Sequence, residues 1–352
     1  MTDEVKQRKL EHVTVALAQD ISAPQRAGWQ DVRLVHQALP EVNLDEIDTS
    51  VTFLGHTLRY PIFISSLTGG HPDVATINRH LARAAQEYGL ALGVGSQRAA
   101  LLNPAVTASF TVTREQAPHA FLIANIGAPQ LIPQERHPAF TLAQVQSAIT
   151  MIKADALAVH MNSLQEAIQP EGDRRATGAA AALQALTAQL EVPVIAKETG
   201  AGVSYEQALL LHVCGVAAID VGGAGGSSMP AIESARLQAR NDGHGAQLGM
   251  LYRDWGIPTP IAVVEASMAG LPLIATGGVR SGLDVARALA LGATLVGIGF
   301  PFLQAASQGY EQVCHLLETI IAQLKVAMQL SGAASIARLR ECSVVVLGET
   351  RE

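Results

Sequence analysis

The feature that most constrains the fold of this chain is a regular alternation of short apolar runs and amphipathic segments from residue 60 onward. Eight runs end in glycine or polar residues, at 60–70, 90–98, 120–128, 156–162, 192–202, 216–226, 271–280 and 293–302. Helix-like segments separate them, at 74–89, 141–154, 177–190, 204–215 and 281–293 among others. Alternating strands and helices pair in parallel through right-handed crossovers. Eight such units predict an α/β fold, the (β/α)8 TIM barrel.

The alternative is a doubly wound open sheet, which does not need eight repeats and usually carries GxGxxG after its first strand. No such motif stands there. We expect residues 1–57 to form an irregular N-terminal extension that contributes to the substrate site, and residues 58–352 to form the barrel. The longest connection, 229–258, is rich in glycine and polar residues, which predicts a mobile lid over about 240–255, with a helix resuming at Thr259.

Composition excludes several classes of protein. The net charge is −7 and no Lys/Arg-rich stripe stands out, so we expect no nucleic-acid partner. Cys214, Cys314 and Cys342 lack metal-ligand spacing. The charged N-terminus lacks the apolar core of a signal peptide, and no apolar stretch reaches the ~20 residues that span a bilayer. These features predict a soluble, cytoplasmic protein without membrane association.

A polar cluster follows the fourth apolar run. His160, Asn162, Gln165 and Glu166 stand within seven residues at the end of 156–162. Barrel enzymes place their chemistry at the carboxyl ends of the strands, so this cluster is a candidate active-site rim. Less specific interpretations remain open: His160 as a structural histidine, Asn162 as a turn cap, and Glu166 paired at the surface with Arg174 or Arg175.

Glycine-rich loops follow the last two strands, at 275–282 and 297–302. Barrels commonly bind phosphate there through backbone N–H groups and a helix N-terminus. Gly277 and Gly278 would let the backbone approach an anion, Arg280 would add charge, and Ser281 is a candidate N-cap. A third loop, 222–228, is either a phosphate-binding nest or a hinge.

Lys197 ends an otherwise apolar strand, where a lysine is destabilising without a partner. It is a Schiff-base lysine, the charge partner of a flavin ring, or the partner of Glu198 in a structural ion pair. The flavin interpretation gains from Ser96 and Asn125 at other strand ends, because a flavin ring needs donors along its polar edge and a cation stabilises its reduced form.

Together these motifs resemble type 2 isopentenyl-diphosphate isomerases, an FMN-dependent family, over nearly the whole chain. The matching motifs are RKLEH (8–12), SLTGG (66–70), GSQR (95–98), ANIGA (124–128), HMNSLQE (160–166), AKETGAG (196–202), DVGGAGGSS (220–228), WGIPT (255–259) and the 275–293 stretch. Among these motifs, HMNSLQE together with RKLEH is the combination most specific to this family. This chain departs from the family pattern at Leu67, where Met is usual, and at Ser227, where Thr is usual.

The resemblance implies roles for individual residues. Residues implied in FMN binding are Leu67, Thr68, Gly69, Ser96, Asn125, Lys197, Ser227, Gly277, Gly278, Arg280, Gly299 and Phe300. Residues implied in substrate binding are Arg8, Lys9, His12, Ser96, Arg98, His160, Asn162 and Gln165. His160, Gln165 and Glu166 are the implied catalytic residues, and Glu166 is the implied Mg²⁺ ligand.

The implied reaction is the reversible conversion of isopentenyl diphosphate to dimethylallyl diphosphate, with reduced FMN, NADPH as reductant and Mg²⁺. The nearest alternative is an FMN-dependent 2-hydroxy-acid oxidase or dehydrogenase on the same barrel. Those enzymes carry a histidine near the sixth-strand loop, which is GGAGGSS here. A cysteine-dependent nucleotide dehydrogenase is disfavoured because no cysteine lies at a predicted strand end, and a non-catalytic flavin module would not require HMNSLQE.

The stretch 311–332 is longer than one barrel helix needs and apolar enough to pack on a neighbouring chain. It predicts a homo-oligomer, and the family resemblance implies a homotetramer or larger.

Overall fold

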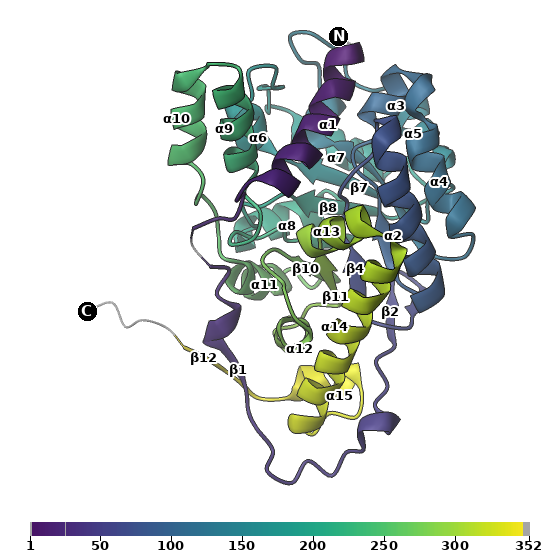
Figure 1. The fold of residues 1–352 in the computed structure, drawn as a ribbon, viewed down its shortest axis with the longest axis vertical. Helices are drawn as coiled ribbons and strands as arrows, with labels where there is room; N and C mark the ends of the chain where they lie inside the picture. The colour runs from purple at the N-terminus through teal and green to yellow at the C-terminus, as the bar shows by residue number, and fades with distance from the viewer. Residues whose placement is uncertain (1, 25, 348–352) are drawn as a thin grey trace.

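The computed structural model describes residues 2–24 and 26–347, with the backbone alone for residues 2–9. A closed barrel of eight parallel strands forms its centre (Figure 1). Around the barrel the strand order is β10-β11-β4-β5-β6-β7-β8-β9, so strands consecutive in sequence are neighbours in space. The predicted (β/α)8 fold is confirmed, and each of the eight apolar runs contains one barrel strand.

The barrel strands are short and buried. They are β4 (Ile62–Ile64), β5 (Ala91–Gly93), β6 (Phe121–Gly127), β7 (Ala156–Met161), β8 (Val194–Glu198), β9 (Ala218–Asp220), β10 (Leu273–Thr276) and β11 (Leu295–Ile298). The register of β6 to β8 matters for the site, because Gly127 pairs with His160 and His160 pairs with Lys197. Lys197 in turn pairs with Asp220 on β9.

Helices surround the barrel, and several of their boundaries follow local capping rules. They are α1 (Thr2–Ala18), α2 (Ala75–Tyr88), α3 (Arg98–Leu102), α4 (Ala108–Gln116), α5 (Leu142–Met151), α6 (Ser163–Ile168), α7 (Ala179–Thr187), α8 (Tyr205–Val213), α9 (Met229–Ala239), α10 (Gly243–Leu251), α11 (Thr259–Ser267), α12 (Gly282–Ala290), α13 (Phe300–Gln308), α14 (Tyr310–Leu330) and α15 (Ile336–Glu341). Ser281 caps α12 as predicted, since its hydroxyl accepts from Asp284 N and the Asp284 carboxylate accepts from Ser281 N.

A hairpin of β2 (Val51–Phe53) and β3 (His56–Leu58) contributes to a core inside the barrel. Phe53 and Leu58 pack with the inward-facing side chains of the strands. Phe53 meets Phe121, the first residue of β6, with ring centroids 5.8 Å apart and an edge-to-face geometry. The hairpin therefore fills the amino-terminal end of the barrel and leaves the carboxyl-terminal end for a ligand.

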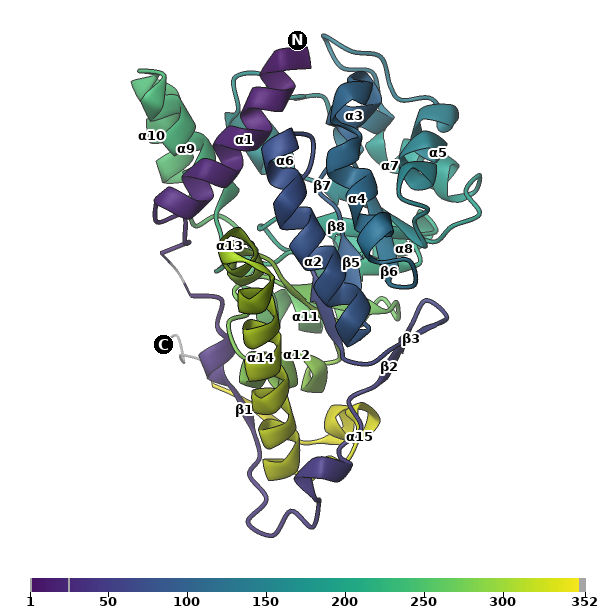
Figure 2. The same cartoon turned by 45° about the vertical axis from the view of Figure 1, so that its right-hand side comes forward.

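Two segments differ from the sequence-based expectations. The N-terminal extension is not irregular, because it begins with the 17-residue helix α1. The connection 229–258 forms the helices α9 and α10, which pack against each other (Figure 2), and most of the expected mobile lid, 240–255, is α10. The helix expected from Thr259 is confirmed as α11. In both views α1 lies across the mouth of the barrel, beside α9 (Figures 1 and 2).

The C-terminal helix α14 packs along α2, α12 and α13. Among the described residues it alone is long and apolar enough to cross a membrane by length and composition, so the expectation that no stretch reaches that length is wrong. Its face toward the barrel, which includes Val313, Leu317 and Leu324, is buried. Beyond it, β12 (Val344–Val346) pairs antiparallel with β1 (Val32–Leu34) near the N-terminal segment.

Candidate active site

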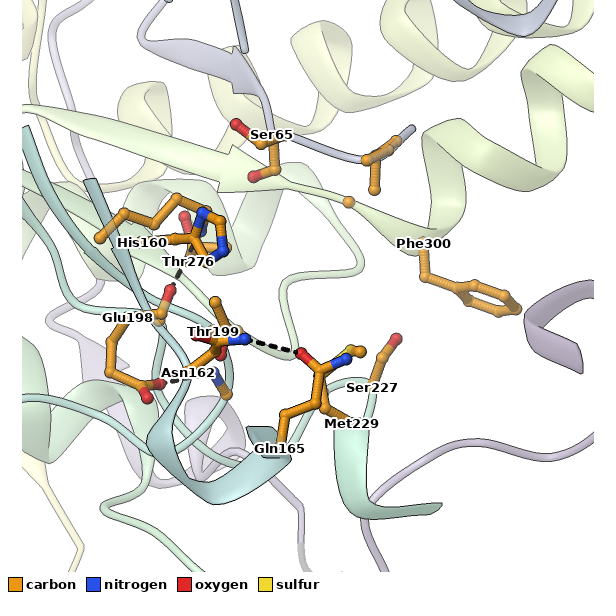
Figure 3. Close-up of a pocket in the computed structure, with 18 of the residues that line it drawn as sticks. Ser65, His160, Asn162, Gln165, Glu198, Thr199, Ser227, Met229, Thr276 and Phe300 are labelled. Atoms are coloured by element: carbon orange, nitrogen blue, oxygen red, sulfur yellow. Dashed lines mark hydrogen bonds between the residues drawn. The ribbon is translucent and has the colours of Figure 1, made fainter. Parts of the chain in front are cut away.

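A cavity opens at the carboxyl-terminal ends of the barrel strands, and loops after most of the strands contribute to its walls. Helix α1 covers one side through His12, Val13 and Ala16. In Figure 3, Gln165, Ser227 and Met229 lie together on one side of the cavity, and Ser65 and Phe300 lie on the other.

His160 leaves the end of β7 and is held by the neighbouring strand β6. Its Nδ1 is 2.8 Å from Asn125 Oδ1. The amide nitrogen of Asn125 donates to Val94 O at 3.0 Å, so its oxygen is the acceptor and His160 Nδ1 carries the proton. His160 is therefore hydrogen-bonded, which its structural and its catalytic interpretation both allow, and the bond fixes its ring inside the cavity.

Gln165 lies on α6, and its amide group has one defined orientation. Gln165 Nε2 donates to Glu233 Oε1 at 2.9 Å, and Gln165 Oε1 accepts from Asn162 Nδ2 at 3.3 Å. Glu233 is buried on α9 and also contacts His12 Nε2 at 2.9 Å and Arg236. Burial acts to raise the pKa of Glu233, but its hydrogen bond with His12 and the charges of His12 and Arg236 hold that pKa at about 2. The carboxylate is thus an obligatory acceptor, which turns the NH₂ group of Gln165 toward it.

Glu166 is buried rather than paired at the surface with Arg174 or Arg175. It is 6% exposed and accepts hydrogen bonds from Asn162 Nδ2 at 2.8 Å and from Asp173 N at 2.7 Å. Asn162 precedes α6 without capping it through its side chain, so the turn-cap interpretation is wrong.

Arg98 reaches the cavity from the start of α3. Its Nη1 lies 2.5 Å from Asp173 Oδ2, and Gln130 Nε2 donates to the same oxygen at 3.2 Å. Both Arg98 and Asp173 are buried. Asp173 therefore links the Arg98 guanidinium to the loop that holds the Glu166 carboxylate.

Lys197 pairs with Asp220 and not with the carboxylate of Glu198. Lys197 Nζ lies 2.8 Å from Asp220 Oδ2 and donates to the backbone oxygen of Glu198 at 3.1 Å. The Glu198 carboxylate accepts instead from the N–H groups of Gly200, Ala201 and Gly202. Burial raises the pKa of Glu198 to about 7, a rise that the backbone N–H groups of Thr199, Gly200 and Ala201 and the charge of Lys197 limit.

The glycine-rich loops after β9 and β10 interlock. A Cβ on Gly277 would lie 2.3 Å from Gly223 O, and a Cβ on Gly226 would lie 2.6 Å from Gly278 N. Gly277 and Gly278 also have φ values of 130° and 64°, which side chains disfavour. Trp29 Nε1 donates to Gly277 O at 3.0 Å, so a residue of the N-terminal segment helps to hold the loop after β10 in place. Backbone packed this closely holds its N–H groups in place for an anion.

Four buried hydroxyl oxygens at the strand ends have no hydrogen-bond partner among the described residues. They belong to Ser65, Ser66, Thr68 and Thr276. Ser65 and Thr276 converge over Gly297, since a Cβ there would lie 2.8 Å from Ser65 Oγ and 2.0 Å from Thr276 Oγ1. Buried polar atoms are nearly always satisfied in native proteins, so the hydroxyls of Ser65, Ser66 and Thr276, which line the cavity, are available to a polar ligand at its mouth.

Most residues that sequence analysis singled out line this one cavity. They are His12, Leu67, Ser96, Arg98, Asn125, His160, Asn162, Gln165, Glu166, Lys197, Ser227, Gly277, Gly278, Arg280, Gly299 and Phe300. Thr68 and Gly69 lie beside it without lining it, with Gly69 packed against Phe110. Arg8 and Lys9 fall within α1, but their side chains lie outside the described residues.

Sequence reasoning missed the residues that hold the site residues in place. It assigned no role to Glu233, Asp173 or Asp220 in the site, nor to Ser65 or Thr276. Ser65 and Thr276 stand at or just after predicted strand ends, so the strand-end rule would have found them. No sequence pattern joins Glu233 to Gln165, 68 positions away.

Comparisons with known proteins agree with this geometry. The sequence model of the FMN-dependent dehydrogenases matches residues 4–124 and 106–345. The isopentenyl-diphosphate delta-isomerase of Methanoregula boonei is 49% identical over 98% of this chain and 95% of its own length. That of Halobacterium salinarum is 46% identical over 99% and 96%. The chain belongs to the FMN-dependent family of isopentenyl-diphosphate delta-isomerases.

Solved structures with the same barrel are more distant in sequence. A lactate oxidase from Pediococcus acidilactici superposes with a TM-score of 0.69 at 16% identity, covering 99% of this chain and 94% of its own. A mandelate oxidase gives a TM-score of 0.63 at 20% identity, covering 98% of both chains. These likenesses show the fold alone.

The residues present fit FMN. A flavin ring offers carbonyl and ring-nitrogen edges to the unpartnered hydroxyls of Ser65, Ser66 and Thr276, which line the cavity. The Gly277–Gly278 backbone and the start of α13 at Phe300 meet the needs of its phosphate. Lys197 contributes a cation to the same cavity.

Proposed function

We propose that this protein catalyses the reversible isomerisation of isopentenyl diphosphate to dimethylallyl diphosphate with reduced FMN. The observation that carries the proposal is the meeting, in one cavity, of the HMNSLQE side chains with a glycine and hydroxyl cradle that fits FMN. Near-full-length relatives named for this activity support it.

In this proposal, the cofactor binds along one side of the cavity. Gly277, Gly278, Arg280, Gly299 and Phe300 take its phosphate. The residues proposed to contact its ring and ribityl chain are Leu67, Thr68, Gly69, Ser96, Asn125, Lys197 and Ser227. When bound and reduced, FMN supplies an electron-rich surface beside the alkene, which stabilises positive charge that develops there.

The diphosphate would bind on the opposite side. Arg98 offers a planar guanidinium suited to phosphate oxygens, and Asp173 keeps it pointed at the cavity. We propose that Arg8, Lys9, His12, Ser96, His160 and Asn162 contact the same group. Glu166 would hold Mg²⁺, which would neutralise negative charge on the diphosphate, since Mg²⁺ commonly binds through one or two carboxylates plus phosphate. Among the described residues no group of three or more His, Cys, Asp or Glu side chains forms a metal site.

Gln165, Glu166 and His160 are the proposed catalytic residues. Moving the double bond requires one proton added and another removed, by groups within about 3 Å of the reacting carbons. Gln165 lies on α6 with its amide held between Asn162 and Glu233, so it can order a water or proton carrier without changing charge itself.

Several broader features belong to the same proposal. Residues 1–57 form an extension that completes the substrate site, and residues 58–352 form the FMN-binding barrel. NADPH reduces the flavin, and the enzyme works in the cytoplasm. A homo-oligomer of four or more chains is supported by an exposed apolar face on α8 and α11, formed by Leu209, Leu210, Val213, Ile261, Val264 and Met268.

The deciding experiment is anaerobic turnover of isopentenyl diphosphate by the purified protein with FMN, NADPH and Mg²⁺, and with each omitted in turn. Product should form only in the complete mixture, without stoichiometric consumption of NADPH. Absence of product, with reduction of bound flavin by a 2-hydroxy acid, would assign the protein to the oxidase alternative. Light scattering on a sizing column tests the oligomer, which a monomer at micromolar concentration would refute.

A further inference from the structure

We infer that Asp220 is a positioning residue that holds Lys197 at the flavin ring and offsets its charge, thereby lowering the preference of the protein for reduced FMN. This inference rests on the proposed binding of FMN. Asp220 does not itself line the cavity, whereas Lys197 does. Its influence on the cofactor would therefore pass through the lysine and through its own electrostatic field.

The two side chains form a buried and well-defined pair. Lys197 on β8 and Asp220 on β9 are direct partners in the barrel register. Lys197 is 7% exposed and Asp220 is 1% exposed, and 2.8 Å separates Nζ from Oδ2. A second bond from Nζ to Glu198 O, at 3.1 Å, leaves the ammonium group little freedom to turn.

Asp220 also connects the lysine to the first glycine-rich loop. Its other oxygen, Oδ1, accepts from Gly222 N at 3.3 Å. Gly222 also bonds to the loop that follows the Lys197 strand, because Gly202 N donates to Gly222 O at 3.0 Å. One carboxylate thus fixes both the cation proposed to face the ring and the start of the 222–228 loop that carries Ser227.

The charge of the pair determines what the cofactor experiences. A lone buried lysine would present a full positive charge and favour the reduced, more negative form of FMN. With Asp220 in contact, the pair is nearly neutral as a whole, and only its positive end faces the cavity. A unit charge a few Å away, in the partly desolvated interior, changes an equilibrium by more than tenfold. The effect of removing the carboxylate charge on the midpoint potential of bound FMN should therefore be measurable.

The test compares the two-electron midpoint potential of bound FMN in the full-length protein and in four variants. Asp220→Asn keeps the side-chain shape and removes the negative charge. Lys197→Gln removes the positive charge, and the double variant removes both. Asp155→Asn is the matched control, because Asp155 forms an ion pair with Arg114 at 2.9 Å but precedes β7, at the other end of the barrel.

We expect Asp220→Asn to raise the preference for reduced over oxidised FMN at least tenfold, which is a rise of about 30 mV for a two-electron couple. Lys197→Gln should shift the potential downward, the double variant should return close to the native value, and Asp155→Asn should leave it unchanged. This order distinguishes an electrostatic role from a purely structural one, since structural damage would not be reversed by a second substitution.

An unchanged or lowered potential in Asp220→Asn would overturn the inference. If that variant fails to hold FMN, the comparison of Lys197→Gln with the double variant decides instead, and equal potentials in those two would overturn it. The outcome is separable from the proposed function. Native protein that binds FMN but fails to isomerise isopentenyl diphosphate refutes the proposed activity, and the potentials still test the role of Asp220.

Discussion

Substituting Glu233 by glutamine should remove a charge on which the native state depends strongly. Glu233 is completely buried and meets His12, Gln165 and Arg236. A carboxyl whose pKa falls from 4.5 to about 2 on folding contributes up to about 3 kcal/mol of stability at neutral pH. Glu233→Gln should therefore lower the free energy of unfolding at pH 7 by about 3 kcal/mol.

The pH dependence gives the sharper test, because its sign is fixed. A carboxyl with a lowered pKa in the folded state stabilises the protein fully above its unfolded-state pKa, near 4.5, and loses that contribution as the pH falls toward 2. The difference between native and Glu233→Gln protein should be constant from pH 7 to about pH 5 and should shrink below that. Urea denaturation of the apoprotein between pH 7 and pH 3.5 measures it.

Glu11→Gln is the matched control for this experiment. Glu11 pairs with Arg236 at 2.9 Å and with Arg240 at 3.0 Å, but its side chain is 27% exposed. Partly exposed pairs contribute about 1 kcal/mol or less. A cost at pH 7 for Glu233→Gln no larger than that of Glu11→Gln would refute the reasoning. So would a cost that stays the same at pH 3.5.

Four further predictions concern the site itself. Gln165→Ala should lower kcat at least about 100-fold while FMN still binds, because its amide faces the substrate side of the cavity. Asp173→Asn should raise KM for the diphosphate about tenfold, since Arg98 loses its partner. Thr276→Val should weaken FMN binding by up to about tenfold in a fluorescence titration, through loss of one hydroxyl. Gly277→Ala should weaken it far more, because a Cβ would lie 2.3 Å from Gly223 O.

Each of these has an outcome that contradicts it. Native turnover in Gln165→Ala would remove that residue from the chemistry. An unchanged KM in Asp173→Asn would show that Arg98 does not need its carboxylate. Unchanged FMN affinity in Thr276→Val would mean that its hydroxyl faces no ligand, and unchanged affinity in Gly277→Ala would mean that the loop adapts to a side chain. Thermal unfolding of each apoprotein provides the control for folding.

The barrel could be predicted because its signal is local and repeated. Each strand is a short apolar run with a polar or glycine end, and each neighbouring helix has a clear beginning, such as Ser281 before α12. The strand-end rule then brought His160, Lys197 and Gly277 into one cavity before any contact was known.

The α9–α10 hairpin shows where composition misled. Glycines at 243, 245 and 249 predicted a mobile loop, yet they lie within α10. The reason is packing, because a Cβ on Gly249 would lie 2.7 Å from Pro230 O and 2.8 Å from the Ser234 side chain. Gly249 and Gly245 allow α10 to approach α9 closely, and that tertiary gain outweighs their low helix propensity, whereas a Cβ on Gly243 would contact nothing.

The acidic residues that hold the site residues in place could not be predicted from the sequence, for a different reason. Sequence analysis gives no role to Asp220, Glu233 or Asp173, since each is a single acidic residue in an ordinary context. Their importance follows from distances across the fold, to Lys197, Gln165 and Arg98. Sequence analysis found the side chains that line the cavity, but only the folded structure shows which charges orient them.

The position of the N-terminal helix and the orientation of Gln165 are not independent. Both His12 and Gln165 contact the same oxygen, Oε1 of Glu233, each at 2.9 Å. When α1 lies over the mouth, His12 shares the acceptor that holds the Gln165 amide and also closes one side of the cavity. If α1 moved away, Glu233 would lose a donor and its pKa would rise, which would weaken its hold on Gln165. In the proposed function, the extension would thus act on the chemistry through one buried carboxylate, in addition to covering one side of the cavity.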